Sequence, residues 1–215
     1  METLDKLNIS LIKSKENIAK AFRGKKSKAN LDKRLPIGQY LTDKFPVLDL
    51  GIQPEFNPKI WKLEVTGEIE EKKVFTWNDI LKMKKTSMTK DFSCVTKWTK
   101  YNIQWSGILW KDFIKYIKIK PNVKSVMFYG SDGYSTNVLI EDLNNDTTLL
   151  AYELENKSIP REHGAPLRII ISHLYGWKGS KFLNKIEFMK EDKPGFWEVR
   201  GYHIRGNVEL EERYS

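Results

Sequence analysis

The sequence Asp91-Phe92-Ser93-Cys94-Val95-Thr96-Lys97-Trp98 holds the only cysteine of this 215-residue chain. A lone thiol forms no internal disulfide, so Cys94 serves either packing or chemistry. Structural cysteines are commonly buried, and packing is therefore one interpretation. Phe92 and Cys94 alternate with polar residues, as at the end of a strand, and the residues around Trp98 are typical of a polar turn with aromatic walls. Nearby lysines favour the thiolate, which is the form that binds a metal or attacks an electrophile.

Length and composition indicate one globular domain. A chain of 215 residues can bury a substantial core, and 40% hydrophobic and 12% aromatic residues are ordinary for such a domain. No apolar run approaches the roughly 20 residues of a membrane span. Residues 1–6 carry no export signal and no internal disulfide can form, so we expect no membrane span and a cytoplasmic location.

The net charge of +9 is concentrated at the N-terminus. Residues 1–34 hold ten of the 37 Lys and Arg residues but four of the 28 Asp and Glu residues, and they are most basic at Lys25-Lys26-Ser27-Lys28. The remaining residues are nearly balanced, with 27 against 24. We therefore divide the chain into a basic helical N-terminal arm, 1–34, and a domain, 35–215. A solvated arm is the ordinary interpretation, and without a nucleic-acid motif we expect no nucleic-acid partner.

Hydrophobic periodicity predicts helices early in the chain and strands later, an order typical of an α+β fold. Four prolines between residues 36 and 58 predict an irregular segment. The predicted helices are one or two within 3–23, ended by Gly24, a short one capped by Thr76 or Asn78 and ending at Met83, and one at 110–117. The predicted strands are the segment ending at Cys94 and residues 61–65, 124–129, 135–140, 148–154, 167–172 and 183–189.

Several motifs occur in a fixed order between residues 34 and 213. They are Cys94-Val95-Thr96-Lys97-Trp98, Trp105-Ser106-Gly107, Arg161-Glu162-His163-Gly164-Ala165-Pro166-Leu167-Arg168, Gly176-Trp177-Lys178-Gly179-Ser180-Lys181, Gly195-Phe196-Trp197-Glu198 and Gly201-Tyr202-His203. Together they resemble the sulfite oxidase superfamily, and most of all its small single-domain members, similar to methionine-sulfoxide reductase catalytic subunits. The resemblance implies a mixed α/β molybdopterin-binding core in a single oxidoreductase domain.

The resemblance also implies that Cys94 is a ligand of molybdenum in a Mo-molybdopterin cofactor and is central to catalysis. A soft thiolate suits a thiophilic metal, and an open coordination position permits catalysis there. One cysteine and three scattered histidines do not have the spacing of a zinc site. Trp98 and Trp105 would line the pocket, although tryptophans are more often part of a core.

Two residues, His163 and Arg168, lie five apart near the start of a predicted strand. The resemblance implies that both hydrogen-bond the pterin. A guanidinium suits planar, bidentate contacts to a heterocycle or a phosphate. Without the resemblance, an arginine at a strand start is most often a surface ion-pair partner.

The glycine-containing loop at residues 176–181 resembles the segment with which the family binds the cofactor. Gly179 and Ser180 would offer backbone N–H groups to the phosphate, while Lys178 and Lys181 would offer positive charge. Read alone, the same loop is a glycine turn with solvated lysines.

Asp132 and Tyr202 are further candidates. Asp132 resembles an aspartate that contacts the cofactor, but an aspartate before a glycine also forms turns. Tyr202 matches a tyrosine that faces the metal, where a phenol donates a hydrogen bond or a proton; a buried aromatic is the alternative. His203 and Arg205 would orient a polar substrate.

The substrate pocket departs from that of sulfite oxidases. No arginine occurs in residues 95–99, and residues 42–44, before Phe45-Pro46-Val47, read Thr-Asp-Lys. We therefore expect oxygen-atom transfer to or from a small substrate of the sulfoxide or N-oxide type, with a sulfite-like substrate left open. The chain has no motif for haem c or an iron–sulfur cluster, so we expect a separate electron-transfer partner. A cofactor-free binding module with this fold and a redox-active Cys94 thiol are the alternatives; reaction direction and oligomeric state stay open.

Overall fold

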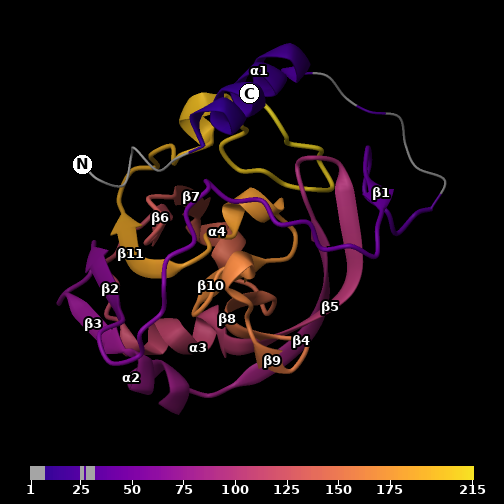
Figure 1. Cartoon of the computed structure of the whole chain (residues 1–215). Coiled ribbons are helices and arrows are strands. Elements are labelled where there is room, and N and C mark those ends of the chain that lie inside the picture. Colours follow the sequence, from indigo (N-terminus) through magenta and orange to yellow (C-terminus); the bar gives the residue numbers. More distant parts are fainter. Residues whose placement is uncertain (1–7, 25–26, 28–31) are drawn as a thin grey trace.

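Two mixed β-sheets form the body of the protein in the computed structural model, which describes residues 8–24, 27 and 32–215 (Figure 1). The first sheet contains β1 (Tyr40–Leu41), β4 (Thr86–Ser93), β5 (Trp98–Leu109), β8 (Thr148–Leu154), β9 (Lys157–Ser158) and β10 (Arg168–Ile171). The second contains β2 (Lys62–Gly67), β3 (Lys73–Thr76), β6 (Ser125–Gly130), β7 (Ser135–Leu139) and β11 (Leu183–Met189). The α-helices are α1 (Ile9–Phe22), α2 (Trp77–Lys82), α3 (Trp110–Phe113) and α4 (Ile140–Leu143), and 3₁₀ turns occupy Ile114–Tyr116, Arg161–His163, Gly176–Lys178 and Glu198–Arg200.

Strand pairing joins segments that are distant in the sequence. In the first sheet β5 pairs antiparallel with β4 and β8 and parallel with β1, and β8 continues to β10 and β9. The second sheet has the order β3-β2-β11-β6-β7, with β2 and β11 parallel. Because β2 and β11 stand near opposite ends of the domain sequence, this sheet forms only when both ends are present.

The main hydrophobic core contains side chains from both sheets. Its members include Val65, Ile108, Val126, Leu150, Ile169 and Ile186, all buried. The indole of Trp110, at the start of α3, lies 5.6 Å from the ring of Phe128 and 6.0 Å from that of Phe188. Each such buried side chain contributes about 1.5–3 kcal/mol by leaving water, which makes this cluster the principal source of stability.

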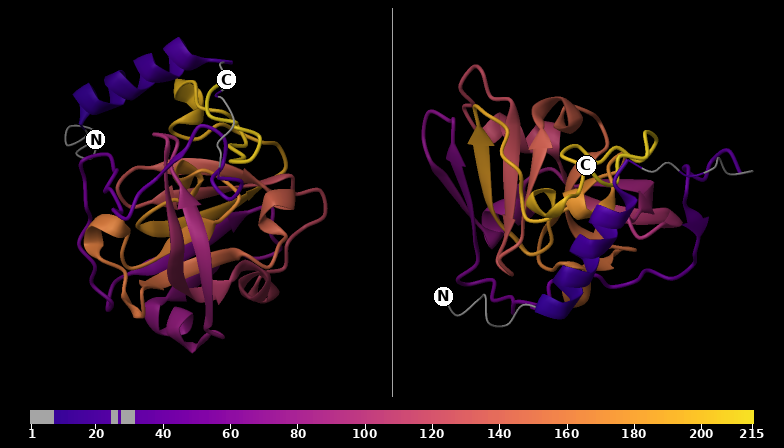
Figure 2. Two further views of the ribbon diagram at one scale, coloured as in Figure 1. Left: turned by 90° about the vertical axis from the view of Figure 1, so that its right-hand side faces the viewer. Right: turned by 90° about the horizontal axis from the view of Figure 1, so that it is seen from above.

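Helix α1 lies across one end of the body, next to the C-terminal segment (Figures 1 and 2). Asn8 begins the helix by accepting a hydrogen bond from the N–H of Leu11 at 3.0 Å. Ile12 and Ala19 are buried in a second apolar cluster that also contains Cys94, so the helix packs on the domain that follows it. Residues 3–7 of the predicted helix and the basic residues Lys25, Lys26 and Lys28 lie outside the described residues.

The predicted fold class is confirmed, and so is the helix capped at Thr76. The predicted strands correspond to β2, β4, β6, β7, β8, β10 and β11, with bounds that differ by a few residues. The expectation of a polar turn around Trp98 is confirmed for Thr96 and Lys97 and wrong beyond them: the turn closes at Lys97, with φ of 73°, and the twelve-residue strand β5 begins at Trp98. The first part of β5 is polar, and its extended form depends on pairing with β4 and, at Trp98 and Thr99, with β1.

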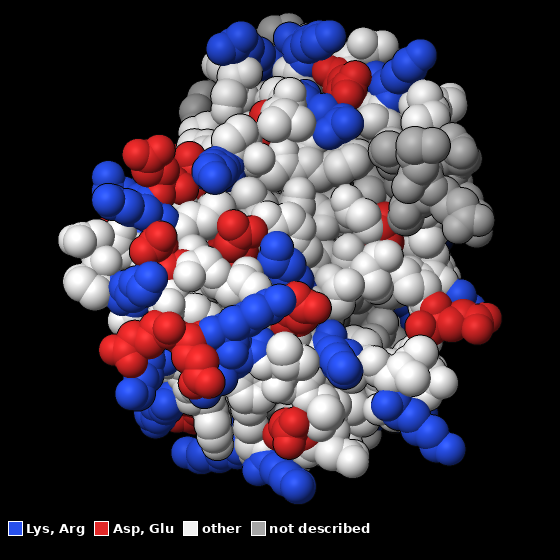
Figure 3. All heavy atoms as spheres, turned by 90° about the vertical axis from the view of Figure 1, so that its left-hand side faces the viewer, with Lys and Arg blue, Asp and Glu red and all other residues white. Residues whose placement is uncertain are grey.

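Charge is unevenly distributed over the surface. On the face shown in Figure 3, Lys and Arg side chains gather at the α1 end, whereas both signs of charge mingle over the sheets. None of the helices in the described residues has the length and apolar character that crossing a bilayer requires.

Candidate active site

A cavity between the β4–β5 turn, α1 and the C-terminal segment gathers most of the predicted site residues. It has an empty volume of about 790 Å³, part of it open to solvent. Of the predicted site residues, its walls contain Cys94, Asp132, His163, Arg168, Gly179, Lys181 and Tyr202. The remaining two, Lys178 and Ser180, do not line it.

Cys94 is held in the cavity wall by the tight turn between β4 and β5. Its N–H donates to the carbonyl of Trp98 at 2.9 Å, and its own carbonyl accepts from the N–H of Lys97 at 3.1 Å. The buried side chain of Gln39 donates to the carbonyls of Cys94 and Trp98, at 3.1 and 3.0 Å. Arg213 in turn donates to Gln39 Oε1 at 2.8 Å. Gln39 and Arg213, which are distant in the sequence, therefore fix the backbone at Cys94 together.

The sulfur of Cys94 is almost fully buried, with 7% of the residue exposed. Burial raises the pKa of the thiol, while a 3.1 Å hydrogen bond from Thr96 Oγ1 and the positive charges of Lys15 and Arg213 act in the opposite direction. Burial is the largest of these effects and favours the thiol, while Thr96, Lys15 and Arg213 offset part of it.

Arg168, at the start of β10, is a buried cation for which the described residues provide no carboxylate partner. Its terminal nitrogens donate to the carbonyls of His163 and Gly179, at 2.8 and 3.3 Å, whereas its Nε has no hydrogen-bond partner in the described part of the chain. The rings of Phe92 and Trp105 lie 5.6 and 5.3 Å from the guanidinium. Burial lowers its pKa to about 10. A buried guanidinium with an unused donor in a cavity wall favours an anionic or hydrogen-bond-accepting ligand.

Two further basic residues lie at the same end of the cavity. Lys181 donates to the carbonyls of Leu48 and Glu162, at 2.9 and 2.7 Å, and burial together with the charge of Arg168 lowers its pKa to about 8. Burial, Lys181 and Arg168 lower the pKa of His163 to about 4, so its imidazole is neutral at pH 7. We call Arg168, Lys181 and His163 the basic end of the cavity.

Asp132 lies near this basic end and is 3% exposed. It accepts the N–H of Tyr134 at 3.2 Å, which is the geometry of a turn, and also lines the cavity. Burial raises its pKa to about 6, despite the opposing charge of Lys181. The turn interpretation made from the sequence is confirmed, and the contact with the cofactor stays a prediction.

The glycines of the 176–181 loop permit close packing. A Cβ on Gly176 would lie 2.4 Å from the ring of Phe92, and one on Gly179 would lie 2.7 Å from the carbonyl oxygen of Ile169. Both glycines line the cavity, so larger residues would displace its wall.

Lys178 does not line the cavity. The sequence had suggested that it would offer positive charge there. Its ammonium is fully buried, pairs with Glu198 at 2.6 Å and donates to the backbone carbonyl and side-chain oxygen of Asn137, at 2.9 and 3.0 Å. Glu198 also accepts from Trp177 Nε1 and Thr136 Oγ1, at 3.0 and 2.9 Å. This buried cluster connects the loop to the C-terminal segment.

An aromatic wall lies on the other side of Cys94. Tyr202, 3% exposed, stacks on Trp197 with ring centroids 5.0 Å apart and meets the edge of Trp177 at 5.1 Å. Burial raises the pKa of Tyr202, so its phenol stays protonated at neutral pH. Trp98 lines the cavity as expected, whereas Trp105 supports Arg168 from behind.

Several contributors escaped the sequence analysis. Lys15 reaches the cavity from α1, and Asp49 from the proline-rich segment. No local pattern marks either one, because tertiary packing brings Lys15 to the cavity with α1 and Asp49 with the proline-rich segment. Conversely, Arg205 does not line the cavity: its guanidinium pairs with Asp142 at 3.0 Å. His203 is likewise absent from the lining.

Comparison with known proteins identifies the family of the chain. The sequence model of the family described as oxidoreductase molybdopterin binding domain matches residues 50–197. The chain is 33% identical over 195 residues to the uncharacterized oxidoreductase YuiH of Bacillus subtilis, covering 90% of this chain and 98% of that protein. It is 28% identical over 177 residues to the protein-methionine-sulfoxide reductase catalytic subunit MsrP of Campylobacter jejuni, covering 74% of this chain and 59% of MsrP.

Among solved structures, the sulfane dehydrogenase SoxCD of Paracoccus pantotrophus is similar, with a TM-score of 0.62 at 18% identity. The match covers 71% of this chain and 43% of the SoxCD chain, and it shows a shared fold. The chain thus spans nearly all of YuiH but little more than half of MsrP and less than half of that SoxCD chain.

Proposed function

The chain belongs to the family of oxidoreductases with a molybdopterin-binding domain, and from that premise we propose that it transfers an oxygen atom between a small substrate and a molybdenum bound by Cys94. It is an enzyme of the sulfite oxidase type with a Mo-molybdopterin cofactor. The cofactor-free binding module that the sequence left open is therefore set aside.

The residues of the cavity fit that cofactor. Arg168 has a buried donor nitrogen with no partner, and Lys181 places a second cation beside it. An anionic, heterocyclic ligand satisfies the free donor and balances both charges. We propose that His163, Arg168, Lys181 and the backbone of Gly179 and Ser180 hold the pterin and its phosphate, with Asp132 contacting the pterin.

Lys178 enters this proposal in a changed role. Its ion pair with Glu198 places its charge away from the cavity, so we propose that it positions the loop whose backbone holds the cofactor. Ser180, whose side chain also points elsewhere, would contribute only its backbone N–H.

Cys94 would bind the metal through its sulfur, on the side of the cavity between the basic end and the aromatic wall. When bound, the cofactor supplies a metal that accepts an oxygen atom and exchanges two electrons. Thr96 Oγ1, 3.1 Å from the sulfur, would hold the thiolate in place. Tyr202 would donate a hydrogen bond or proton to the departing oxygen through its protonated phenol.

For the substrate we propose a sulfoxide or N-oxide and the reductive direction. A sulfoxide, two electrons and two protons give a sulfide and water. The apolar substituents of a sulfoxide suit a wall made of Trp177, Trp197 and Tyr202, and no arginine occurs in residues 95–99 to balance a dianion such as sulfite. The relatives named as methionine-sulfoxide reductases support this choice.

The two electrons would come from a separate protein partner, because the sequence has no second redox motif. The MsrP relative is itself named a catalytic subunit, which implies a further subunit in that protein. We also keep the cytoplasmic location and the absence of a nucleic-acid partner as proposals; cell fractionation and the salt dependence of nucleic-acid retention test them.

The observation that carries the proposal is that Cys94 and Arg168 lie in the walls of one cavity, where Nε of Arg168 has no hydrogen-bond partner among the described residues. The experiment is an elemental and pterin assay of the protein and its Cys94→Ser variant from a molybdopterin-competent host, followed by a screen of sulfoxides, N-oxides and sulfite. We expect equimolar molybdenum in the wild type and loss of turnover in Cys94→Ser with pterin retained. A wild-type protein without molybdenum or pterin contradicts the proposal.

A further inference from the structure

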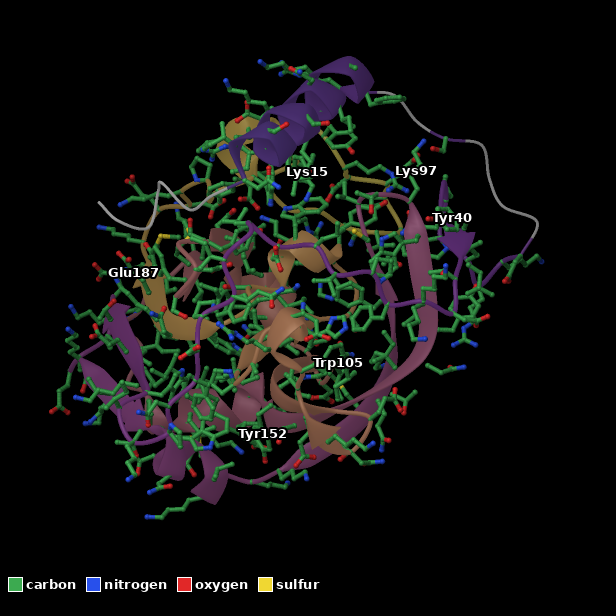
Figure 4. All side chains as sticks on the ribbon, viewed as in Figure 1. Lys15, Tyr40, Lys97, Trp105, Tyr152 and Glu187 are labelled. Atoms are coloured by element: carbon green, nitrogen blue, oxygen red, sulfur yellow. The ribbon has the colours of Figure 1, made fainter. Side chains whose placement is uncertain are left out.

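Lys15 is the one residue of α1 in the cavity lining, and it is half-buried there (Figure 4). Figure 4 places it on the side of the helix that faces the body of the protein. Its ammonium lies 5.1 Å from the ring centroid of Trp197, a cation–π contact. Within the described part of the chain, no hydrogen bond or ion pair engages this ammonium.

The charges around Lys15 distinguish it from the basic end of the cavity. Burial lowers its pKa, whereas Cys94 and Asp49 raise it. The charges that act on Lys181 are those of Arg168, Asp49, Asp132 and Cys94. Cys94 and Asp49 thus act on both lysines, whereas the positive charge of Arg168 acts on Lys181.

The carboxylate of Asp49 lines the same cavity and acts on the ammonium of Lys15. Asp49 itself is held by hydrogen bonds from Gly51 N–H and Gln53 Nε2, at 2.9 and 2.8 Å. A carboxylate in the same cavity wall disfavours a dianion beside Lys15 and leaves a dipolar oxygen as the better-suited partner of the ammonium. The aromatic rings of Trp197 and Tyr202 beside it provide an apolar surface.

These observations define a ligand with a strongly polarised oxygen on one side and apolar groups on the other. Building on the function proposed above, we propose that Lys15 binds the oxygen of a neutral sulfoxide substrate, whose substituents lie on Trp197 and Tyr202. The N-terminal helix is then part of the substrate pocket, and its ammonium directs the substrate oxygen toward the side of the cavity that holds Cys94.

The test compares Lys15→Met, Lys15→Arg and the control Lys13→Met in the cofactor-loaded enzyme. Lys13 is exposed on the same helix. Lys13→Met therefore removes the same charge from α1 as Lys15→Met does, but at a residue that does not line the cavity. Reduction of methyl phenyl sulfoxide by a chemically reduced dye gives kcat and KM. Binding of dimethyl sulfone, which keeps the polarised oxygens, is measured separately by tryptophan fluorescence.

We expect Lys15→Met to raise KM for the sulfoxide and Kd for the sulfone by about tenfold, the effect of losing one charge-assisted hydrogen bond. Molybdenum and pterin content stay unchanged, Lys15→Arg keeps most of the affinity, and Lys13→Met behaves as wild type. Unchanged KM and Kd in Lys15→Met overturn the inference. So does loss of pterin from that variant, which would make Lys15 a cofactor ligand.

Failure of the proposed function has a different signature. A wild-type enzyme that contains molybdenum but oxidises sulfite, and whose Lys15→Met variant loses sulfite affinity, would assign Lys15 to an anion and overturn the sulfoxide assignment. A wild type without molybdenum would remove the proposed function and this inference together.

Discussion

The buried ion pair between Lys178 and Glu198 yields the sharpest prediction about stability. Its atoms lie 2.6 Å apart, and the side chains are 0% and 1% exposed. Removing one partner of such a pair leaves the other charge buried and uncompensated, at a cost of about 3–5 kcal/mol. Lys178→Met should therefore lower the free energy of unfolding by that amount, equivalent to roughly 6–20 °C in Tm for a domain of this size.

The assay is urea unfolding and thermal denaturation of cofactor-free and cofactor-loaded protein, because ligand binding itself shifts apparent stability. Lys73→Met is the matched control: Lys73 pairs with Glu71 at 2.7 Å, but on the surface, and we expect no measurable loss. The double variant Lys178→Met/Glu198→Gln should recover part of the loss, because it also removes the uncompensated buried charge.

The reasoning is refuted if cofactor-free Lys178→Met unfolds at the wild-type midpoint. If that protein nevertheless loses pterin, Lys178 contacts the cofactor, as the sequence motif had suggested.

Two further predictions concern the basic end of the cavity. Arg168→Met should reduce pterin content strongly without aggregation, because it removes a buried cation that has no protein counter-charge; pterin fluorescence after acid release measures this, and full pterin retention would contradict the assignment. Asp132→Asn should stabilise the cofactor-free protein at pH 7 by up to about 3 kcal/mol and have no effect at pH 3. The pKa of Asp132 is about 6 in the folded protein and 3.8 for an ordinary aspartate. Between these pH values the folded protein binds a proton that the unfolded protein has lost, so the folded protein loses stability as the pH rises from 3.8 to 6. Urea unfolding of the wild type and of Asp132→Asn at pH 7 and pH 3 measures this effect. Equal unfolding midpoints of the two proteins at pH 7 would contradict a raised pKa of the buried Asp132 carboxyl.

Motifs in the sequence, through their resemblance to the sulfite oxidase superfamily, were sufficient to predict several residues of the cavity wall. Cys94, His163, Arg168 and Lys181 each stand in a short motif, and the structure brings them together from the β4–β5 turn, the strand β10 and the loops beside it. Their roles as ligands stay predictions, and without the resemblance the spacing of these motifs would not have placed them in one cavity.

What the sequence did not predict depends on tertiary packing. Lys15 lies 79 positions before Cys94 and reaches it only because Ile12 and Ala19 bury α1 against the domain. Lys178 was assigned to the cofactor by its motif, yet it forms a buried ion pair with Glu198, 20 positions later. Contacts of this kind cannot be predicted from the periodicity of the sequence.

The strand β5 illustrates a similar limit in secondary structure. It contains Lys100, Asn102 and Gln104, polar residues that commonly indicate a loop. Pairing with β4 along most of the strand, with β1 at Trp98 and Thr99 and with β8 from Trp105 onward supplies the hydrogen bonds that make the segment extended.

The direct test of the central claim is X-ray absorption at the molybdenum edge, applied to the wild type and to Cys94→Ser. The account predicts one sulfur ligand fewer in the variant, with the pterin sulfurs retained in both. An identical sulfur count in the two proteins would show that the metal is bound without Cys94 and would contradict the account.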